Sequence, residues 1–134
     1  MDCLFCKIAQ HKSPSYTVIE NDDSIAFLDI HPLSTGHTVV IPKQHADRII
    51  DLPAPLVGRL FLTVKAVSDR IHASLKPDGL TIGINDGAGA QQGAGHLHVH
   101  IIPRWNGDGG SNVHAVVQNA PKESLAAILS KLKQ

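Results

Sequence analysis

The sequence has no excess of either charge, no long apolar run and very little cysteine. Its 12 basic and 12 acidic side chains balance, so nothing indicates a nucleic-acid-binding groove or a polybasic membrane patch. No stretch approaches the roughly 20 apolar residues that cross a bilayer, and the N-terminus lacks the basic start and apolar run of a signal peptide. We therefore expect a cytoplasmic protein that has neither nucleic acid nor membrane as a partner.

The two cysteines, Cys3 and Cys6, are too few for a disulfide framework. At Cys-x-x-Cys spacing in a reducing compartment, they favour a metal half-site or a redox pair over a structural disulfide. A length of 134 residues is sufficient to bury a core without disulfides. We expect one domain, covering residues 1–134, with no internal repeat or linker.

The hydrophobic pattern predicts a mainly antiparallel α+β domain. Helical spacing of apolar residues from 56 to 75, with stop signals at 77–79, predicts one long helix. Shorter helices are expected at 3–10 and from Pro121 onward. Short apolar runs that predict strands, the first two joined in a hairpin, occupy residues 16–19, 25–28, 37–42 and 80–84.

The most informative stretch is 92–102, in which imidazoles alternate with branched aliphatic side chains. In a β-strand this period of two sends the two sets to opposite faces. The aliphatic set would lie in the core and fix the register, which leaves the imidazoles together on the other face. A glycine-rich run, 87–95, leads into the strand, so its backbone N–H groups can approach a ligand. The predicted row of imidazoles comprises His96, His98 and His100.

Three interpretations of this row remain open. Residues i and i+4 of a strand lie about 13 Å apart, while a zinc ligand must reach to about 2.1 Å from the metal, so all three histidines cannot easily share one ion. They could simply be polar residues on a half-exposed strand. A free imidazole beside a glycine-rich loop suits nucleophilic attack at phosphorus, which needs no magnesium. The glycine run itself has no Gly-Lys-Ser/Thr and precedes a strand, which excludes a Walker A loop and a dinucleotide fingerprint.

Residues 96–102, His-Leu-His-Val-His-Ile-Ile, resemble the signature of the histidine triad (HIT) superfamily, and Gln92 ahead with Pro103-Arg104 behind resembles its bacterial Hint-like branch. The resemblance implies a HIT-like fold, a homodimer, and a hydrolase or transferase that acts at the α-phosphorus of purine nucleoside phosphoramidates or related nucleotide esters. A non-catalytic nucleotide sensor or scaffold, a dinucleoside polyphosphate hydrolase and a zinc-binding interaction module are the alternatives. Further blocks that resemble the family lie at 3–8, 25–30, 36–45 and 85–87.

The resemblance also implies roles for single residues. His98 matches the nucleophile, and His100 and His37 match histidines that contact the phosphate. Asp29 matches the carboxylate that accepts both ribose hydroxyls, a sound pairing of two donors with two oxygens, although a loop aspartate often caps a turn instead. The other candidate nucleotide contacts, each with a core or hairpin role as its alternative, are Phe27, Ile30, Asn85, Gln91, Gln92 and Gly93.

One departure from the family pattern concerns the residues before the triad. Family members often carry Gly-Gln-Ser or Gly-Gln-Thr where this chain has Gln91, Gln92 and Gly93. The hydroxyl that donates to the leaving group is therefore absent, and phosphoramidate turnover is expected to be weaker. Gln91 in place of glycine is expected to narrow the phosphate loop.

The resemblance implies a second site, a structural zinc. Related uridylyltransferases and bacterial HIT proteins pair the Cys-x-x-Cys motif with two histidines, which match His45 and His96 here. Four sulfur and nitrogen ligands, Cys3, Cys6, His45 and His96, would make a closed site. The alternative is a pair of reduced, partly buried cysteines with His45 capping a turn.

Overall fold

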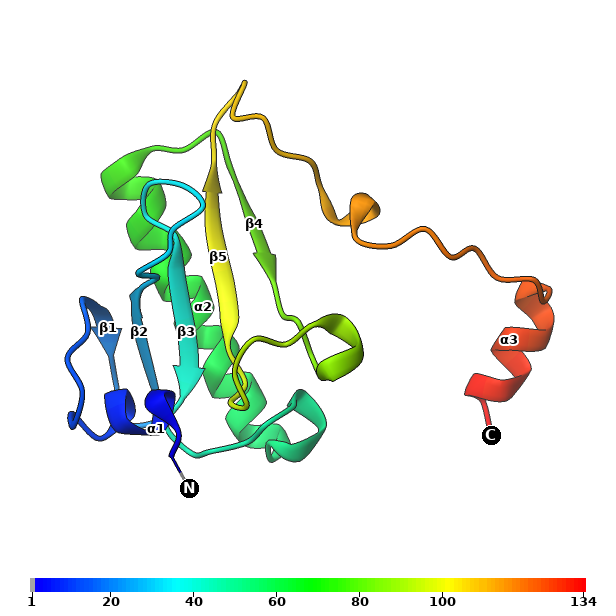
Figure 1. Ribbon diagram of the computed structural model, residues 1–134, viewed down its shortest axis with the longest axis horizontal. Coiled ribbons are helices and arrows are strands. Elements are labelled where there is room, and N and C mark those ends of the chain that lie inside the picture. Colours follow the sequence, from blue (N-terminus) through cyan, green and yellow to red (C-terminus); the bar gives the residue numbers. More distant parts are fainter. Residues whose placement is uncertain (1) are drawn as a thin grey trace.

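The computed structural model describes residues 2–134 and contains a five-stranded sheet with one long helix across it (Figure 1). Every neighbouring pair of strands is antiparallel, which confirms the expected α+β class. The long helix, α2 (Ala54–Leu75), has 22 residues and follows Pro53. In spatial order the strands are β1 (Thr17–Glu20), β2 (Ser24–Leu28), β3 (Thr38–Pro42), β5 (Val99–Arg104) and β4 (Gly79–Gly83).

Helix α2 covers one face of the sheet. Its apolar stripe, which includes Leu60 and Val67, is fully buried against the aliphatic residues that alternate with the histidines. The helix ends where Lys76 adopts a left-handed conformation, just before Pro77. The predicted burial of the aliphatic set is confirmed for Leu97, Val99 and Ile101.

The other face of the sheet is covered in part by α1 (Leu4–Ala9). This helix is short, and the Cys3 thiol accepts a hydrogen bond from the Cys6 N–H at its start. Its Ile8 and Phe5 pack with Phe27 and with the outward aliphatic residues of β2 and β3. The Cys-x-x-Cys motif therefore begins a helix that lies against the same sheet face as the histidines.

The prediction of one continuous strand that carries His96, His98 and His100 was wrong for the first two histidines. The β5 ladder begins only at Val99, so His96 and His98 lie in the irregular segment before it. Both side chains are buried, at 0% and 7% exposure, because the Phe5 ring packs against them. Only His100 of the row is partly exposed. A contact between segments about 90 residues apart has no periodic signature, so the sequence pattern could not show it.

Two shorter predictions also need correction. The last helix, α3 (Leu125–Leu132), begins four residues after Pro121, because Ser124 provides its N-cap by accepting from the Ala127 N–H. The glycine-rich run contains a 3-10 turn, η2 (Ala88–Ala90), instead of a fully open loop. Further 3-10 turns are η1 (Ile49–Asp51) and η3 (Val113–Ala115).

The chain leaves the sheet after β5 and runs along the β4 side of the molecule. Figure 1 shows α3 at the end of this C-terminal segment, separated from the sheet. Its apolar residues Leu125 and Leu132 are 79% and 77% exposed. None of the helices in residues 2–134 has the length and hydropathy needed to span a membrane.

Candidate functional site

Three histidines and one carboxylate meet on the sheet face opposite α2. The rings of His98 and His100 have centroids 5.0 Å apart, and those of His100 and His37 are 5.2 Å apart. The Asp29 carboxylate lies 3.5 Å from His37 Nε2 and 4.0 Å from His100 Nδ1. The structure thus brings together four residues that the sequence assigned to one site, from the end of β2, the start of β3 and β5.

A backbone group fixes the proton positions of His37 and His100. The Leu33 N–H donates to His37 Nδ1 at 3.1 Å, so the proton of the neutral His37 ring resides on Nε2. That Nε2–H donates to His100 Nδ1 at 3.0 Å, which leaves the His100 proton on its own Nε2. The hydrogen bonds of this chain therefore all run the same way: the Leu33 N–H donates to His37, and His37 donates to His100.

Both rings of this chain favour the uncharged state. Burial lowers the pKa of His37 from its ordinary value, and the nearby Asp29 carboxylate opposes this only in part. Burial also lowers the pKa of His100, with smaller contributions from His98 and His37. At neutral pH the chain therefore supplies hydrogen-bond donors and no imidazolium.

His98 has the opposite arrangement of its ring nitrogens. Its Nδ1 lies 2.8 Å from the carbonyl oxygen of His96, which can only accept, so Nδ1 carries the proton. The Nε2 atom of the neutral ring then holds a free lone pair. Phe5 packs edge-on against this ring, with centroids 5.2 Å apart, and restricts its orientation. An oriented, unprotonated Nε2 is the nitrogen that a nucleophilic histidine requires.

Asp29 combines the two roles considered for it. One oxygen, Oδ1, accepts the His31 N–H at 2.8 Å, as a turn-capping aspartate does. The other, Oδ2, faces His37 and His100. One carboxylate oxygen thus holds the loop while the other stays available to a hydroxyl donor.

Asp29, His37 and His100 also have the composition of a metal site, since their ligand atoms all lie within 4.8 Å of one another. The proton positions argue against that role. A metal on His37 Nε2 would need a lone pair there, while the Leu33 N–H already uses the lone pair of Nδ1. A neutral imidazole has only one such lone pair, so this trio fits a hydrogen-bonded chain and not a metal centre.

A second cluster joins Cys3, Cys6, His45 and His96, as predicted for the metal site. Its contacts include His45 Nδ1 to His96 Nδ1 at 3.1 Å, Cys6 Sγ to His45 Nδ1 at 3.2 Å and Cys3 Sγ to His96 Nδ1 at 3.4 Å. A tetrahedron with ordinary zinc–nitrogen and zinc–sulfur bonds has edges of about 3.3–3.8 Å. The distances between the four ligand atoms are therefore close to those expected around a zinc ion.

The hydrogen bonds around this cluster show that its donor set fits a cation. His96 Nε2–H donates to the Pro42 carbonyl at 2.9 Å, and His45 Nε2–H donates to Asp47 at 2.7 Å. Both inward Nδ1 atoms therefore present lone pairs to each other, an arrangement that repels unless a positive ion lies between them. Outer hydrogen bonds of this kind orient histidines that bind metals. Burial, together with Cys3, raises the pKa of the Cys6 thiol, so a metal ion must displace its proton.

The remaining candidate nucleotide contacts occupy varied environments. Phe27 is 5% exposed and packs edge-on against Phe5, which is the core position considered as its alternative. Ile30 is 72% exposed, and Asn85, Gln91 and Gly93 are also exposed. Gln91 holds a left-handed conformation with φ of 60°, unusual for a residue other than glycine.

Gln92 holds the glycine-rich loop closed through its side-chain amide. Its Oε1 accepts the Gly87 N–H, and its Nε2 donates to the carbonyls of Asp47 and Ala94, each at 2.7 Å. Three hydrogen bonds therefore join the two ends of the loop to the segment after β3. The side chain positions the loop backbone and is committed to protein partners.

Three participants in the site were missed by sequence reasoning. Phe5 was assigned only to a short helix, yet it packs against His96 and His98. The Leu33 N–H and Asp47 orient His37 and His45 through hydrogen bonds. The position of Phe5 between the two cysteines was an available signal, because a metal bound by Cys3, Cys6 and His96 brings that turn against the triad.

Comparisons with known proteins agree with this geometry. The HIT domain family matches residues 10–107. The adenylylsulfatase HINT3 of Arabidopsis thaliana is 37% identical over 107 residues, which cover 80% of this chain and 54% of the relative. A histidine triad nucleotide-binding protein from Candida albicans has a crystal structure that superposes with a TM-score of 0.83 at 28% identity, covering 98% of this chain and 95% of the other.

A third similar protein contains a metal. The crystal structure of a zinc-bound histidine triad family protein from Mycobacterium smegmatis superposes with a TM-score of 0.76 at 31% identity. The match covers 99% of this chain and 96% of the other.

Proposed function

This chain belongs to the HIT domain family, and from that membership we propose that it binds purine nucleotide conjugates and hydrolyses or transfers their nucleotidyl group through His98. The observation that carries the proposal is the proton arrangement of His98. Because Nδ1–H is committed to the His96 carbonyl, Nε2 of the neutral ring holds the free lone pair. The substrates proposed are nucleoside phosphoramidates and related nucleotide esters.

The proposed reaction has two displacements at the α-phosphorus. His98 Nε2 donates its lone pair to phosphorus, the bond to the leaving amine or alcohol breaks, and that group departs with the electron pair and takes a proton from solvent. Water then attacks the nucleotidyl-histidine, loses a proton, and the phosphorus–nitrogen bond breaks to restore His98. The sum is one water consumed, with one mononucleotide and one amine or alcohol released.

The neighbouring residues have supporting roles in this proposal. The His37–His100 chain would donate to a phosphoryl oxygen through His100 Nε2–H, which places a hydrogen-bond donor where negative charge accumulates. Asp29 Oδ2 would accept the ribose hydroxyls, since Oδ1 is held by the His31 N–H. Gln92 would shape the backbone of the glycine-rich loop around the phosphate.

We also propose that Cys3, Cys6, His45 and His96 hold a structural zinc ion. Four protein ligands close such a site, and the ion would supply a cross-link between α1 and the segment that carries His98. The lone pairs that face each other in the cluster and the zinc-bound relative support this proposal. A homodimer remains a prediction from the resemblance, and a cytoplasmic location remains a prediction from the sequence composition.

The proposed function is tested by trapping the intermediate. Incubation with adenosine or guanosine phosphoramidates, a quench without acid and intact mass spectrometry should show an adduct of one nucleoside monophosphate. His98→Ala should abolish the adduct and slow turnover strongly, while His114→Ala, in the exposed C-terminal segment, serves as the matched control. Equal product release by wild type and His98→Ala would falsify the assignment of the nucleophile.

The absence of a hydroxyl at Gly93 favours a second candidate, a nucleotide sensor that does not turn over. Calorimetry with purine mononucleotides separates the possibilities. Binding without turnover of any substrate would support the sensor. No binding at all would leave a zinc-dependent interaction module.

A further inference from the structure

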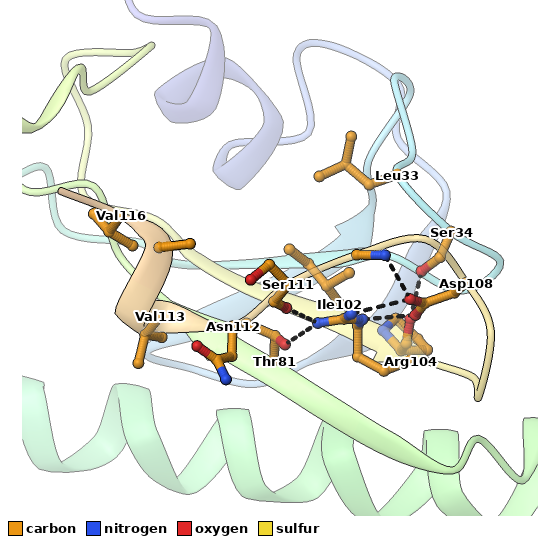
Figure 2. Close-up of a pocket in the computed structure, with 13 residues that line it drawn as sticks. Leu33, Ser34, Thr81, Ile102, Arg104, Asp108, Ser111, Asn112, Val113 and Val116 are labelled. Atoms are coloured by element: carbon orange, nitrogen blue, oxygen red, sulfur yellow. Dashed lines mark hydrogen bonds and ion pairs between the residues drawn. The ribbon is translucent and has the colours of Figure 1, made fainter. Parts of the chain in front are cut away.

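A hollow lies beside the histidines, on the same face of the sheet. It has a volume of about 380 Å³, is open to solvent, and lies between the sheet and the segment that follows β5. Ile102 and Thr81 line it from β5 and β4, and Val113 and Val116 line it from the C-terminal segment (Figure 2). This volume falls within the range of small-molecule sites in proteins, about 300–1,000 Å³.

The cavity adjoins the catalytic row. Side chains two residues apart on a strand share a face and lie about 7 Å apart, which places Ile102 next to His100 on β5. Leu33 lines the cavity with its side chain, while its N–H donates to His37. On the other flank, above β2 and β3, His98 contacts Phe5. The histidines therefore separate an aromatic flank from this cavity.

Among residues 2–134, Arg104 is the cation that lines the cavity, and most of its N–H groups are engaged. Arg104 donates through Nε and Nη2 to the two oxygens of Asp108, at 2.7 and 3.0 Å. Its Nη1 donates to Thr81 Oγ1 and to the Ser111 carbonyl, as Figure 2 shows. Four of its five N–H groups have partners, and its charge is balanced by Asp108. The pair holds the pKa of the Asp108 carboxyl far below its usual range.

Two other polar side chains at the cavity form hydrogen bonds within the chain. Ser34 donates to the Pro103 carbonyl at 2.7 Å, and Asn112 Oδ1 accepts the His114 N–H at 3.0 Å. The lining is otherwise aliphatic, with Leu33, Ile102, Val113 and Val116. A cavity of this kind binds an apolar group and offers no unpaired cation to a phosphate or a carboxylate.

We propose that this cavity receives the leaving group of the substrate and selects neutral, apolar amines or alcohols. The inference rests on the proposed nucleotidyl transfer at His98. With the nucleoside on the Asp29 and Ile30 side, the group displaced from phosphorus extends to the opposite flank of the row. Among the substrate classes considered, this disfavours dinucleoside polyphosphates, whose leaving group carries phosphates.

In this proposal, the part of the C-terminal segment that lines the cavity, residues 110–116, determines which leaving groups the protein accepts. The Arg104–Asp108 pair sets its course, and a Cβ at Gly110 would collide with the Arg104 guanidinium, so the close return of the chain at this point favours glycine. Val116 and Val117 are neighbouring valines that allow a matched comparison of a lining residue with a residue outside the lining. Both are exposed, at 75% and 70%, but only Val116 lines the cavity.

The test uses three adenosine phosphoramidates whose leaving groups are methylamine, hexylamine and aminohexanoate. All three are primary alkylamines of similar basicity, so a difference in kcat/KM reports contact with the protein and not leaving ability. Wild type should prefer hexylamine to methylamine by about tenfold or more, and should not gain from the chain that ends in a carboxylate. Val116→Asp should remove the preference, chiefly by lowering kcat/KM for the hexylamine substrate.

Val117→Asp is the matched control and should behave as wild type on all three substrates. Equal kcat/KM for the three leaving groups in wild type, or a uniform loss across all substrates in Val116→Asp, would overturn the inference while leaving the proposed function intact. A preference for aminohexanoate would overturn the apolar assignment. If wild type hydrolyses none of the substrates, the proposed function fails, and the inference fails with it.

Discussion

The buried His37–His100 pair makes the stability of the protein depend on pH in a direction that can be derived. Both rings have a pKa below the ordinary 6.5 because they are buried, with side chains 3% and 22% exposed. Below pH 6.5 the unfolded chain binds protons that the folded chain does not. The stability supplied by the neutral rings is therefore present above pH 6.5 and is lost as the pH falls below it.

The magnitude follows from the number of rings. Each proton bound only by the unfolded state contributes a slope of about 1.4 kcal/mol per pH unit. Two rings give a limiting slope of about 2.7 kcal/mol per pH unit, reached where the unfolded histidines are charged and the folded ones are not. Over one pH unit, a change in the free energy of unfolding at this limiting slope would be a large part of a typical stability of about 5–15 kcal/mol.

Denaturant unfolding at intervals from pH 7.5 to 5.0 measures this slope. His37→Asn and His100→Asn should each make this slope shallower, by up to about 1.4 kcal/mol per pH unit, because each removes one ring whose pKa burial lowers. His72→Asn, on an exposed position of α2, is the matched control and should leave it unchanged. If both site variants retain the wild-type slope, the reasoning from burial is refuted.

Three further predictions concern the metal cluster, the loop and the core. Cys6→Ser should lower zinc well below one atom per chain in elemental analysis and reduce the melting temperature, and wild type with equally little zinc would contradict the site. Gln92→Ala should raise KM for nucleotide substrates, because three hydrogen bonds that close the glycine-rich loop are lost; an unchanged KM would show that the loop backbone does not bind substrate. Leu60→Ala, at a fully buried position of α2, should destabilise folding by about 2–5 kcal/mol in denaturant titrations without changing zinc content.

Elements with a clear repeat were predictable from the sequence. The 3.6-residue spacing of α2 and the alternation of Leu97, Val99 and Ile101 identified the helix and the buried face of the sheet. The family resemblance then identified the HIT fold, and it selected Asp29 and His37, which the structure places beside His100.

Features that depend on contacts between distant segments were not predictable. The burial of His96 and His98 follows from the packing of Phe5, and no local pattern indicates where a six-residue helix will lie. The cavity beside His100 depends on the return of residues 110–116, a segment without periodicity that is positioned by Arg104 and Asp108. Proton positions also escape sequence reasoning, because they depend on which backbone groups face each ring.

His96 connects the two centres through opposite ends of one residue. Its ring is turned toward the two thiols, and its carbonyl oxygen receives the proton-bearing nitrogen of His98. A rotation of this peptide unit would change the metal geometry and the aim of the nucleophile at the same moment. Substitutions of Cys3 or Cys6 should therefore change the rate of the proposed reaction at phosphorus, even when the protein still folds.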